Sequence, residues 1–167
     1  MIYDFNGKYP DIDKNSYISP SVDVIGDVSI GKDSSIWFGS VIRADMHYVK
    51  IGSRTNIQDN STVHVTTDLY PTIIGDEVTI GHNVIVHGCQ IEDRCLIGMG
   101  SIIMDGVVIG SGSLIGAGAL VSPGTIIPPN SLVVGLPGKI VRSTTSKEQN
   151  EIIDRAQHYI DFSKKYI

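Results

Sequence analysis

The sequence predicts an all-β solenoid, a parallel β-helix of hexapeptide repeats followed by one C-terminal α-helix. Three observations predict it: aliphatic residues recur every six positions, glycine often follows them directly, and the last twenty residues change to a helical pattern. An α-helix has a period of about 3.6 residues and a strand a period of about 2. A period of six instead indicates short strands joined by tight corners, with three hexapeptides in each triangular coil.

The repeat occupies most of the 167 residues, and its aliphatic side chains are expected to point into the prism. Each stacks on its equivalent one coil away, at about the 4.8 Å spacing of neighbouring strands. A composition of 41% hydrophobic but only 7% aromatic residues suits such small, layered packing. The repeating positions are Ile18, Val24, Ile30, Ile36, Ile42, Ile51, Ile57, Val63, Ile74, Ile80, Val86, Ile91, Ile97, Ile103, Ile109, Ile115, Val121, Ile127 and Val133.

The C-terminal segment is predicted to be a helix that covers the solenoid, because a solenoid buries its core only between neighbouring coils. We expect a β-helix over residues 1–142 and a helical segment over residues 143–167, packed on the prism in the same domain. Thr145 and Glu148 have the spacing of a capping box, which predicts a helix from about residue 146 to residue 165. Its apolar stripe is Ile152, Ile153, Ala156, Tyr159, Ile160 and Ser163.

Composition excludes several classes of partner. The formal charge of −5 argues against nucleic acid and anionic membranes. No stretch approaches the roughly 18 consecutive apolar residues of a membrane span, and the first residues lack a secretory signal pattern. The two cysteines, Cys89 and Cys95, do not make a disulfide framework, so we expect a reducing, cytoplasmic location.

The repeat breaks in the middle of the chain, and most of the histidines lie there. The spacing between aliphatic positions rises from six to nine around residues 45–49 and to eleven around residues 66–71. We interpret both surpluses as loops extruded from corners, where functional residues tend to lie. The histidines in or beside this region are His47, His64, His82 and His87.

When those loops are left out and successive hexapeptides are assigned to the three faces of the prism in turn, His87 falls one coil above His64, and His64 falls one coil above Arg43. Two imidazoles one strand spacing apart can share a metal ion, since Zn–N bonds are about 2.0–2.1 Å long. His82 belongs to a different corner and would reach that ion only from a neighbouring chain. If a strand began at Leu69, His64 would move toward His82 instead, but the polar, proline-containing sequence there favours the first count. Imidazole suits zinc best, with iron or cobalt as alternatives.

Several motifs together resemble the γ-class carbonic anhydrases and their relatives over most of the chain. Hexapeptide repeats alone are shared with many acyltransferases, whereas the combination of Arg-x-Asp, Asn-Ile-Gln-Asp and three histidines is specific. The motifs are Arg43-Ala44-Asp45, Asn56-Ile57-Gln58-Asp59, His64, Ile80-Gly81-His82, His87-Gly88-Cys89, Ile97-Gly98-Met99-Gly100 and Val134-Gly135-Leu136-Pro137-Gly138-Lys139.

The resemblance implies a homotrimer of left-handed prisms with one metal ion at each interface. His64 and His87 would come from one chain and His82 from its neighbour, holding Zn²⁺, or alternatively Fe²⁺ or Co²⁺. The implied reaction is the reversible hydration of carbon dioxide to bicarbonate by a metal-bound hydroxide, a lyase reaction on a small-molecule substrate.

Other positions take roles from the same resemblance. Gln58 would hydrogen-bond near the metal-bound solvent, with Asn56 beside it, and Tyr159 of the terminal helix would approach the site. For Tyr159 the alternative is a stripe residue that packs on the prism.

Arg43 would pair with Asp45 or Asp59 and hold the interface, which leaves these three residues a structural role. The chain lacks the acidic-loop glutamates that shuttle protons in well-characterised members, so we expect an intact metal site with low hydration activity. His47 is the candidate substitute shuttle, because an unperturbed imidazole titrates near pH 6.5.

Two other functions fit the same fold. One is chemistry on an acyl thioester, either an acyl-CoA thioesterase that uses the metal or an acyltransferase that uses a histidine base. The other is a non-catalytic metal-binding scaffold. Tight, stoichiometric metal would favour the anhydrase or the hydrolase over the transferase, which does not require all three histidines.

Overall fold

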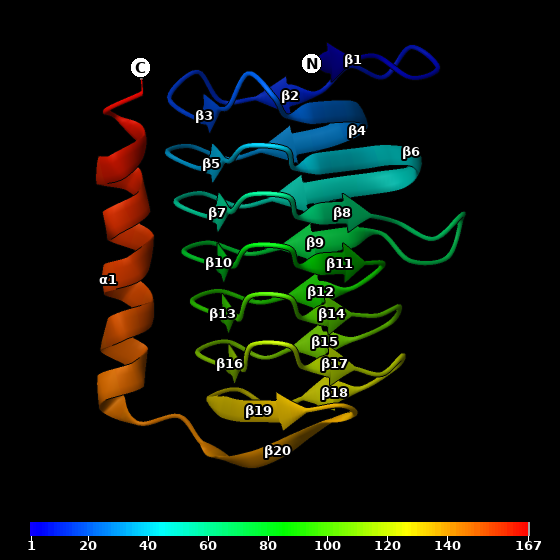
Figure 1. Ribbon diagram of the computed structural model, residues 1–167. Helices are drawn as coiled ribbons and strands as arrows, with labels where there is room; N and C mark the ends of the chain where they lie inside the picture. Colours follow the sequence, from blue (N-terminus) through cyan, green and yellow to red (C-terminus); the bar gives the residue numbers. More distant parts are fainter. Residues whose placement is uncertain (167) are drawn as a thin grey trace.

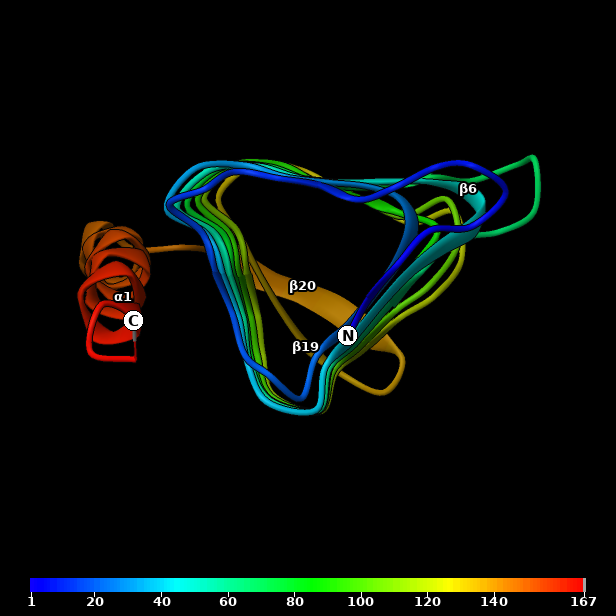
Figure 2. The same cartoon turned by 90° about the horizontal axis from the view of Figure 1, so that it is seen from above.

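The structure, a computed structural model, describes residues 1–166 as a parallel β-solenoid with one C-terminal helix (Figure 1). Seen along its axis, the solenoid is a triangular prism, and the helix lies outside one side of it (Figure 2). The predicted fold, hexapeptide coils followed by a C-terminal helix, is confirmed. Among the described residues, no helix combines the length and the apolar character that crossing a bilayer requires.

Two sheets form the three sides of the prism. An eight-stranded sheet makes the side that faces the helix, and a twelve-stranded sheet folds around a corner to make the other two. The first contains β3 (Tyr17–Ile18), β5 (Ser35–Ile36), β7 (Asn56–Ile57), β10 (Thr79–Ile80), β13 (Leu96–Ile97), β16 (Leu114–Ile115), β19 (Ser131–Gly135) and β20 (Gly138–Ser143). The second contains β1 (Ile2–Tyr3), β2 (Asp11–Ile12), β4 (Asp23–Ile30), β6 (Val41–Ile51), β8 (Thr62–His64), β9 (Thr72–Ile74), β11 (Ile85–His87), β12 (Gln90–Ile91), β14 (Ile102–Ile103), β15 (Val108–Ile109), β17 (Leu120–Val121) and β18 (Ile126–Ile127).

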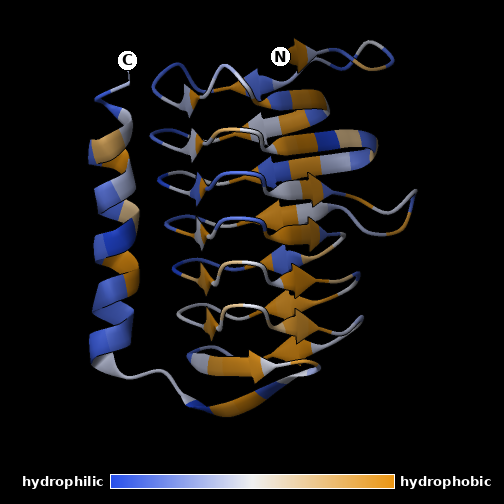
Figure 3. Ribbon diagram, in the orientation of Figure 1, coloured by the Kyte–Doolittle hydropathy of each residue, from blue (hydrophilic) through white to orange (hydrophobic). Residues whose placement is uncertain are grey.

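The core is a stack of aliphatic side chains in register. Ile57 pairs with Ile80, and Ile80 pairs with Ile97, so equivalent residues of successive coils lie one above the other. All the repeating positions named above are buried except Ile18, which is half-buried. Figure 3 shows the hydrophobic residues gathered in the short strands of the coils. This stacking gives every corner the same geometry, which is what brings residues of different coils together.

The sequence predicts a loop at residues 45–49, and that prediction is wrong. The segment is the middle of β6, which runs unbroken from Val41 to Ile51 and bends round a corner beside β4 (Figure 1). The register between the two strands shifts at Gly26–Val28. The surplus residues are therefore absorbed as a bulge: residues 45–48 oppose Asp27 alone, while β6 stays paired with β4 on both sides of them.

Residues 66–71 do form a projecting loop, as the sequence predicts. It is closed by an isolated bridge in which the Thr66 N–H donates to the Tyr70 carbonyl at 2.9 Å. The loop leaves the side of the solenoid at which β8 and β11 end (Figure 1). It therefore lies beside the two histidines that terminate those strands.

Helix α1 (Ser146–Ser163) lies along the solenoid and begins with the expected capping box. It ends slightly earlier than predicted, with Lys164 as its C-cap. Of the predicted stripe, Ile153 is 37% exposed, whereas the fully buried members are Ile152, Ala156, Ile160 and Ser163. An aromatic cluster fastens the helix to the first coils, and its members are Tyr17, Trp37, Phe38, Tyr159, Phe162 and Tyr166.

Candidate metal centre

His64 and His87 lie one above the other at the ends of β8 and β11. They are register partners, as the face count predicts. The Nδ1 atom of His64 lies 3.1 Å from the Nε2 atom of His87, and the ring centroids are 5.1 Å apart. Two nitrogens bound to one tetrahedral zinc ion would be about 3.3 Å apart, given Zn–N bonds of about 2.0–2.1 Å. We call these two residues the histidine pair, and their spacing suits two ligands of one ion.

A carboxylate holds the outer nitrogen of each imidazole in the histidine pair. Asp45 Oδ1 lies 3.1 Å from His64 Nε2, and Asp105 Oδ1 lies 2.8 Å from His87 Nδ1. Metal-binding histidines typically donate their second ring N–H to such a partner, which fixes the tautomer and the ring orientation. The two nitrogens that face each other are thereby left with lone pairs. The donor set fits a divalent ion that prefers nitrogen ligands.

The charges around His64 keep this part of the site ready for a metal. Burial is the main cause that lowers the pKa of His64, and it outweighs the hydrogen bond that His64 donates to Asp45, which raises the pKa. Burial raises the pKa of Asp45, but its bonds to His64 and Arg43 outweigh this and leave it below the ordinary value. Arg43 forms an ion pair with Asp45, one of the two expected partners. A neutral imidazole beside an ionised carboxylate is the state that metal binding needs.

His82 lies at a different corner, as predicted, and its imidazole lies close to the Asp59 carboxylate there. Its Nδ1 atom is 2.8 Å from Asp59 Oδ2, so its Nε2 atom stays available. Residues 1–166 of this single chain contain no group of three or more His, Cys, Asp or Glu side chains arranged to hold a metal ion. One chain therefore supplies the histidine pair and, at a separate corner, a third imidazole that also lies beside a carboxylate.

Asn56 and Gln58 are buried and bonded to each other beside the His82 corner. Gln58 Nε2 donates to Asn56 Oδ1 at 3.1 Å, and Asn56 Nδ2 donates to Thr79 Oγ1 at 2.8 Å. Neither amide hydrogen-bonds to a histidine within the described part of the chain. Both are therefore fixed in place next to Asp59 rather than next to the histidine pair.

Tyr159 lies on the helix face that covers this same corner. Its ring packs edge-on against Trp37 with centroids 5.4 Å apart. Burial is the main cause that raises the pKa of Tyr159, and the negative charge of Asp59 adds to it. Tyr159 thus packs on the prism and also lies close enough to Asp59, the carboxylate beside His82, for its charge to affect the tyrosine pKa.

His47 and Cys89 lie close to the histidine pair without contacting it. His47 Nδ1 accepts from the Tyr48 N–H at 2.9 Å, and His47 lines a cavity of about 140 Å³ together with Asp45. Cys89 is buried, and burial raises the pKa of its thiol to about 12. A protonated thiol is neither a good nucleophile nor a metal ligand, so Cys89 has a packing role.

Sequence reasoning missed Asp105, which contacts His87 directly. One coil there is seventeen residues long, since Val86 pairs with Ile103, so the face count places Asp105 above Gly88, the residue that follows His87. Its signal is only a turn residue, aspartate before glycine, that every corner of a solenoid can use.

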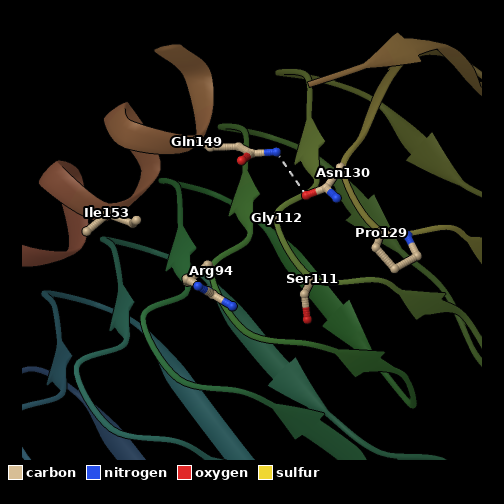
Figure 4. A pocket seen from close by; sticks show the side chains of 7 residues that line it. All are labelled: Arg94, Ser111, Gly112, Pro129, Asn130, Gln149 and Ile153. Carbon is tan, nitrogen blue, oxygen red and sulfur yellow. Dashed lines mark hydrogen bonds between the residues drawn. The ribbon is translucent and has the colours of Figure 1, made fainter. Parts of the chain in front are cut away.

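A separate cavity lies where the first turns of α1 approach another corner of the prism (Figure 4). It has a volume of about 250 Å³, and Arg94 is its only charged lining residue. Gln149 Nε2 donates to Asn130 Oδ1 at 2.9 Å across one side of it. It contains no histidine and none of the predicted site residues, so it is not part of the candidate metal centre.

Comparison with known proteins finds close relatives along the whole chain. The family model "Bacterial transferase hexapeptide (six repeats)" matches residues 71–103 and 88–123. The chain is 52% identical over 153 residues to a "Probable carbonic anhydrase" of Methanocaldococcus jannaschii, covering 92% of this chain and 96% of that protein. It is 45% identical over 164 residues to the mitochondrial γ carbonic anhydrase 1 of Arabidopsis thaliana, covering 95% of this chain but only 60% of the plant protein.

A solved structure has almost the same backbone. The crystal structure of a hexapeptide transferase family protein from Anaplasma phagocytophilum superimposes with a TM-score of 0.96 at 39% identity. The match covers 100% of this chain and 98% of that one. Relatives of this fold therefore carry both carbonic anhydrase and transferase names.

Proposed function

The chain belongs to the γ-class carbonic anhydrase family of hexapeptide-repeat proteins, and from this membership we propose that it catalyses the reversible hydration of carbon dioxide to bicarbonate with a bound metal ion. The observation that carries the proposal is the histidine pair, with facing nitrogens 3.1 Å apart and a carboxylate behind each ring. Chemistry on an acyl thioester by a histidine base would need only one such imidazole.

In this proposal the ligands are the histidine pair of one subunit and His82 of a second subunit, in a homotrimer. Zinc is the preferred ion, with Fe²⁺ or Co²⁺ as alternatives. Zinc held by three neutral imidazoles supplies Lewis-acid activation of water near neutral pH. The chain's own part is to orient the rings. Asp45 and Asp105 do so by accepting from the outer nitrogens of His64 and His87, and Asp59 Oδ2 lies 2.8 Å from His82 Nδ1.

We further propose that the His82 corner brings the remaining expected residues to the site. Gln58 precedes Asp59 in the chain, and the charge of Asp59 reaches Tyr159. A subunit that provides His82 would therefore provide Gln58, Asn56 and Tyr159 as well, to orient the substrate oxygens. Arg43, paired with Asp45, would help to hold the interface on the side of the histidine pair.

For the proton, we propose His47 as the group that passes it to solvent. The cavity of about 140 Å³ that His47 shares with Asp45 supports this, because Asp45 in turn bonds to His64. The cavity is large enough for water, which can carry a proton between separated groups.

The test is to measure bound zinc per chain and then assay carbon dioxide hydration and acyl-CoA hydrolysis on the same preparation. We expect about one zinc per chain, hydration activity and no thioester hydrolysis. His64→Ala should lose both metal and hydration, because one of two adjacent ligands is gone. His47→Ala should keep its metal but hydrate carbon dioxide slowly unless an imidazole buffer is added.

The matched control is His158→Ala, because His158 stacks on Phe162 in α1 away from the pair and should change neither quantity. A His64→Ala protein that retains zinc contradicts the ligand assignment. Thioester hydrolysis or acyl transfer without hydration would instead favour the transferase names of the relatives.

A further inference from the structure

Asp105 lies one coil above Gly88, in the turn between β14 and β15, and its carboxylate faces the imidazole of the preceding residue, His87. Asp105 Oδ1 accepts a hydrogen bond from His87 Nδ1 at 2.8 Å and another from the Thr66 hydroxyl. Thr66 begins the projecting loop, so the loop and the histidine are fastened to the same oxygen. Asp105 stands outside every motif that defines the family resemblance.

The space that the carboxylate occupies exists because residue 88 is a glycine. A Cβ atom on Gly88 would clash with Asp105 Oδ1 and would lie 2.9 Å from the Tyr70 Cβ. The backbone at Gly88 also has a φ of +53°, which favours glycine. Gly88 thus leaves the carboxylate a direct approach to His87.

Asp105 is placed to accept a hydrogen bond from His87. Its Oδ1 atom lies 2.8 Å from His87 Nδ1 and also accepts from the Thr66 hydroxyl. An ionised carboxylate accepts hydrogen bonds and cannot donate them. His87 must therefore carry its proton on Nδ1, which leaves a lone pair on Nε2, the atom that faces His64 at 3.1 Å.

We propose that Asp105 is a positioning residue that selects the metal-binding tautomer of His87 and aims its Nε2 atom at the point shared with His64. This inference rests on the proposed function, in which that shared point is the metal position. Asp45 does the same for His64, but it also pairs with Arg43. Asp105 is the simpler case to test, because its hydrogen-bond partners are Thr66 and His87 and do not include an arginine.

The variant that tests this is Asp105→Asn, which keeps the shape of the side chain. An amide can donate to Nδ1 as well as accept from it, so the proton of His87 is free to move to Nε2 and block the ligand position. Loss of such a carboxylate behind a metal-binding histidine typically weakens metal binding about 10- to 100-fold. We expect that loss in zinc affinity, measured by competition with a chelator of known affinity.

A second readout needs no metal. Long-range ¹⁵N NMR of the metal-free protein, labelled in histidine, reports which ring nitrogen carries the proton. We expect His87 to be protonated on Nδ1 in the wild-type chain and to shift toward protonation on Nε2 in Asp105→Asn. Thermal unfolding of both proteins checks that the variant is folded.

The matched control is Asp93→Asn. Asp93 sits above Gly75 as Asp105 sits above Gly88, but its Oδ1 atom accepts from the backbone N–H of Asp76, at 2.9 Å. We expect Asp93→Asn to leave both zinc affinity and the His87 tautomer unchanged.

Two results would overturn the role of Asp105: a wild-type His87 protonated on Nε2, or wild-type zinc affinity retained by Asp105→Asn. Failure of the proposed function looks different, because the wild-type chain would then bind no zinc at all.

Discussion

Gly88 shows how one residue can serve both the corner of a coil and the candidate metal centre. The turn needs the positive φ that glycine adopts without strain, and the Asp105 carboxylate occupies the space that a side chain at residue 88 would fill. Gly100 has the first requirement without the second, since its φ is +68° and no atom lies within 4 Å of the point that a Cβ atom would occupy. The two glycines therefore separate backbone strain from displacement of the carboxylate.

We predict that Gly88→Ala and Gly100→Ala both destabilise the fold, each by roughly 1–2 kcal/mol from left-handed strain. Only Gly88→Ala should also weaken zinc binding, because its Cβ pushes Asp105 away from His87. Thermal unfolding and zinc titration of both variants provide the measurement. Equal zinc affinities in the two variants would show that the space above Gly88 has no part in the site.

For single residues, the sequence could identify the histidine pair but not the carboxylates that contact the imidazoles. His64 and His87 follow buried aliphatic residues that stack in register, so their juxtaposition follows from counting. The close contact of His82 with Asp59 joins residues of neighbouring coils at a corner, and it depends on side-chain rotamers that no spacing specifies.

Among the elements, α1 is the one whose start the sequence locates best. The Thr145 hydroxyl accepts from the Glu148 N–H at 3.2 Å, and the Glu148 carboxylate accepts from the Thr145 N–H at 2.7 Å. Arg142 also donates to Glu148, and this bond is the main cause that lowers the pKa of Glu148 to about 2, with Thr145 contributing as well. A capping box is a local motif, which is why four residues of sequence suffice to find it.

We predict a pH-dependent stability difference between the wild-type chain and Glu148→Gln. The pKa of Glu148 is about 2 in the folded chain and near 4.5 in the unfolded one, so its ionised form stabilises the fold. That contribution is complete above pH 4.5 and is lost as the pH falls toward 2. Denaturant unfolding of both proteins across this range should show the difference shrinking with acid; a constant difference would contradict the role of the carboxylate.

The sequence could not predict that residues 45–49 belong to the strand β6. Three surplus residues in a repeat can leave the coil as a loop or stay in it as a bulge, and both keep the aliphatic positions in phase. Here β4 pairs with β6 on both sides of the corner, and this pairing keeps the surplus residues in the strand as a bulge. The five surplus residues after Val65 have no such partner strand and form the projecting loop.

For the whole molecule, the proposed site requires at least two chains. One chain offers the histidine pair at one corner and His82 at another, and only a neighbouring prism could bring them together. Cyclic symmetry repeats such a contact at every interface of a closed ring, so each subunit would contribute to two sites.

We predict that mixing inactive variants restores metal sites. His64→Ala and His82→Ala should each bind little zinc alone, because every interface lacks one ligand. Refolded together in equal amounts, they should recover about a quarter of the interfaces, those that pair an intact His64 with an intact His82. Zinc per chain and hydration activity of the mixture measure the recovery. A mixture that stays empty would contradict a site shared between subunits.

The sequence alone determined the coil, the buried stack and the residues that share a corner, because a repeat places the same local environment at every sixth position. It also determined the helix start, through a motif only four residues long. The tertiary structure decided the course of residues 45–49, the carboxylate behind each imidazole and the face of α1 that meets Trp37. Those outcomes depend on which side chains of separate coils meet and on which strands find partners, and neither is encoded in a local period.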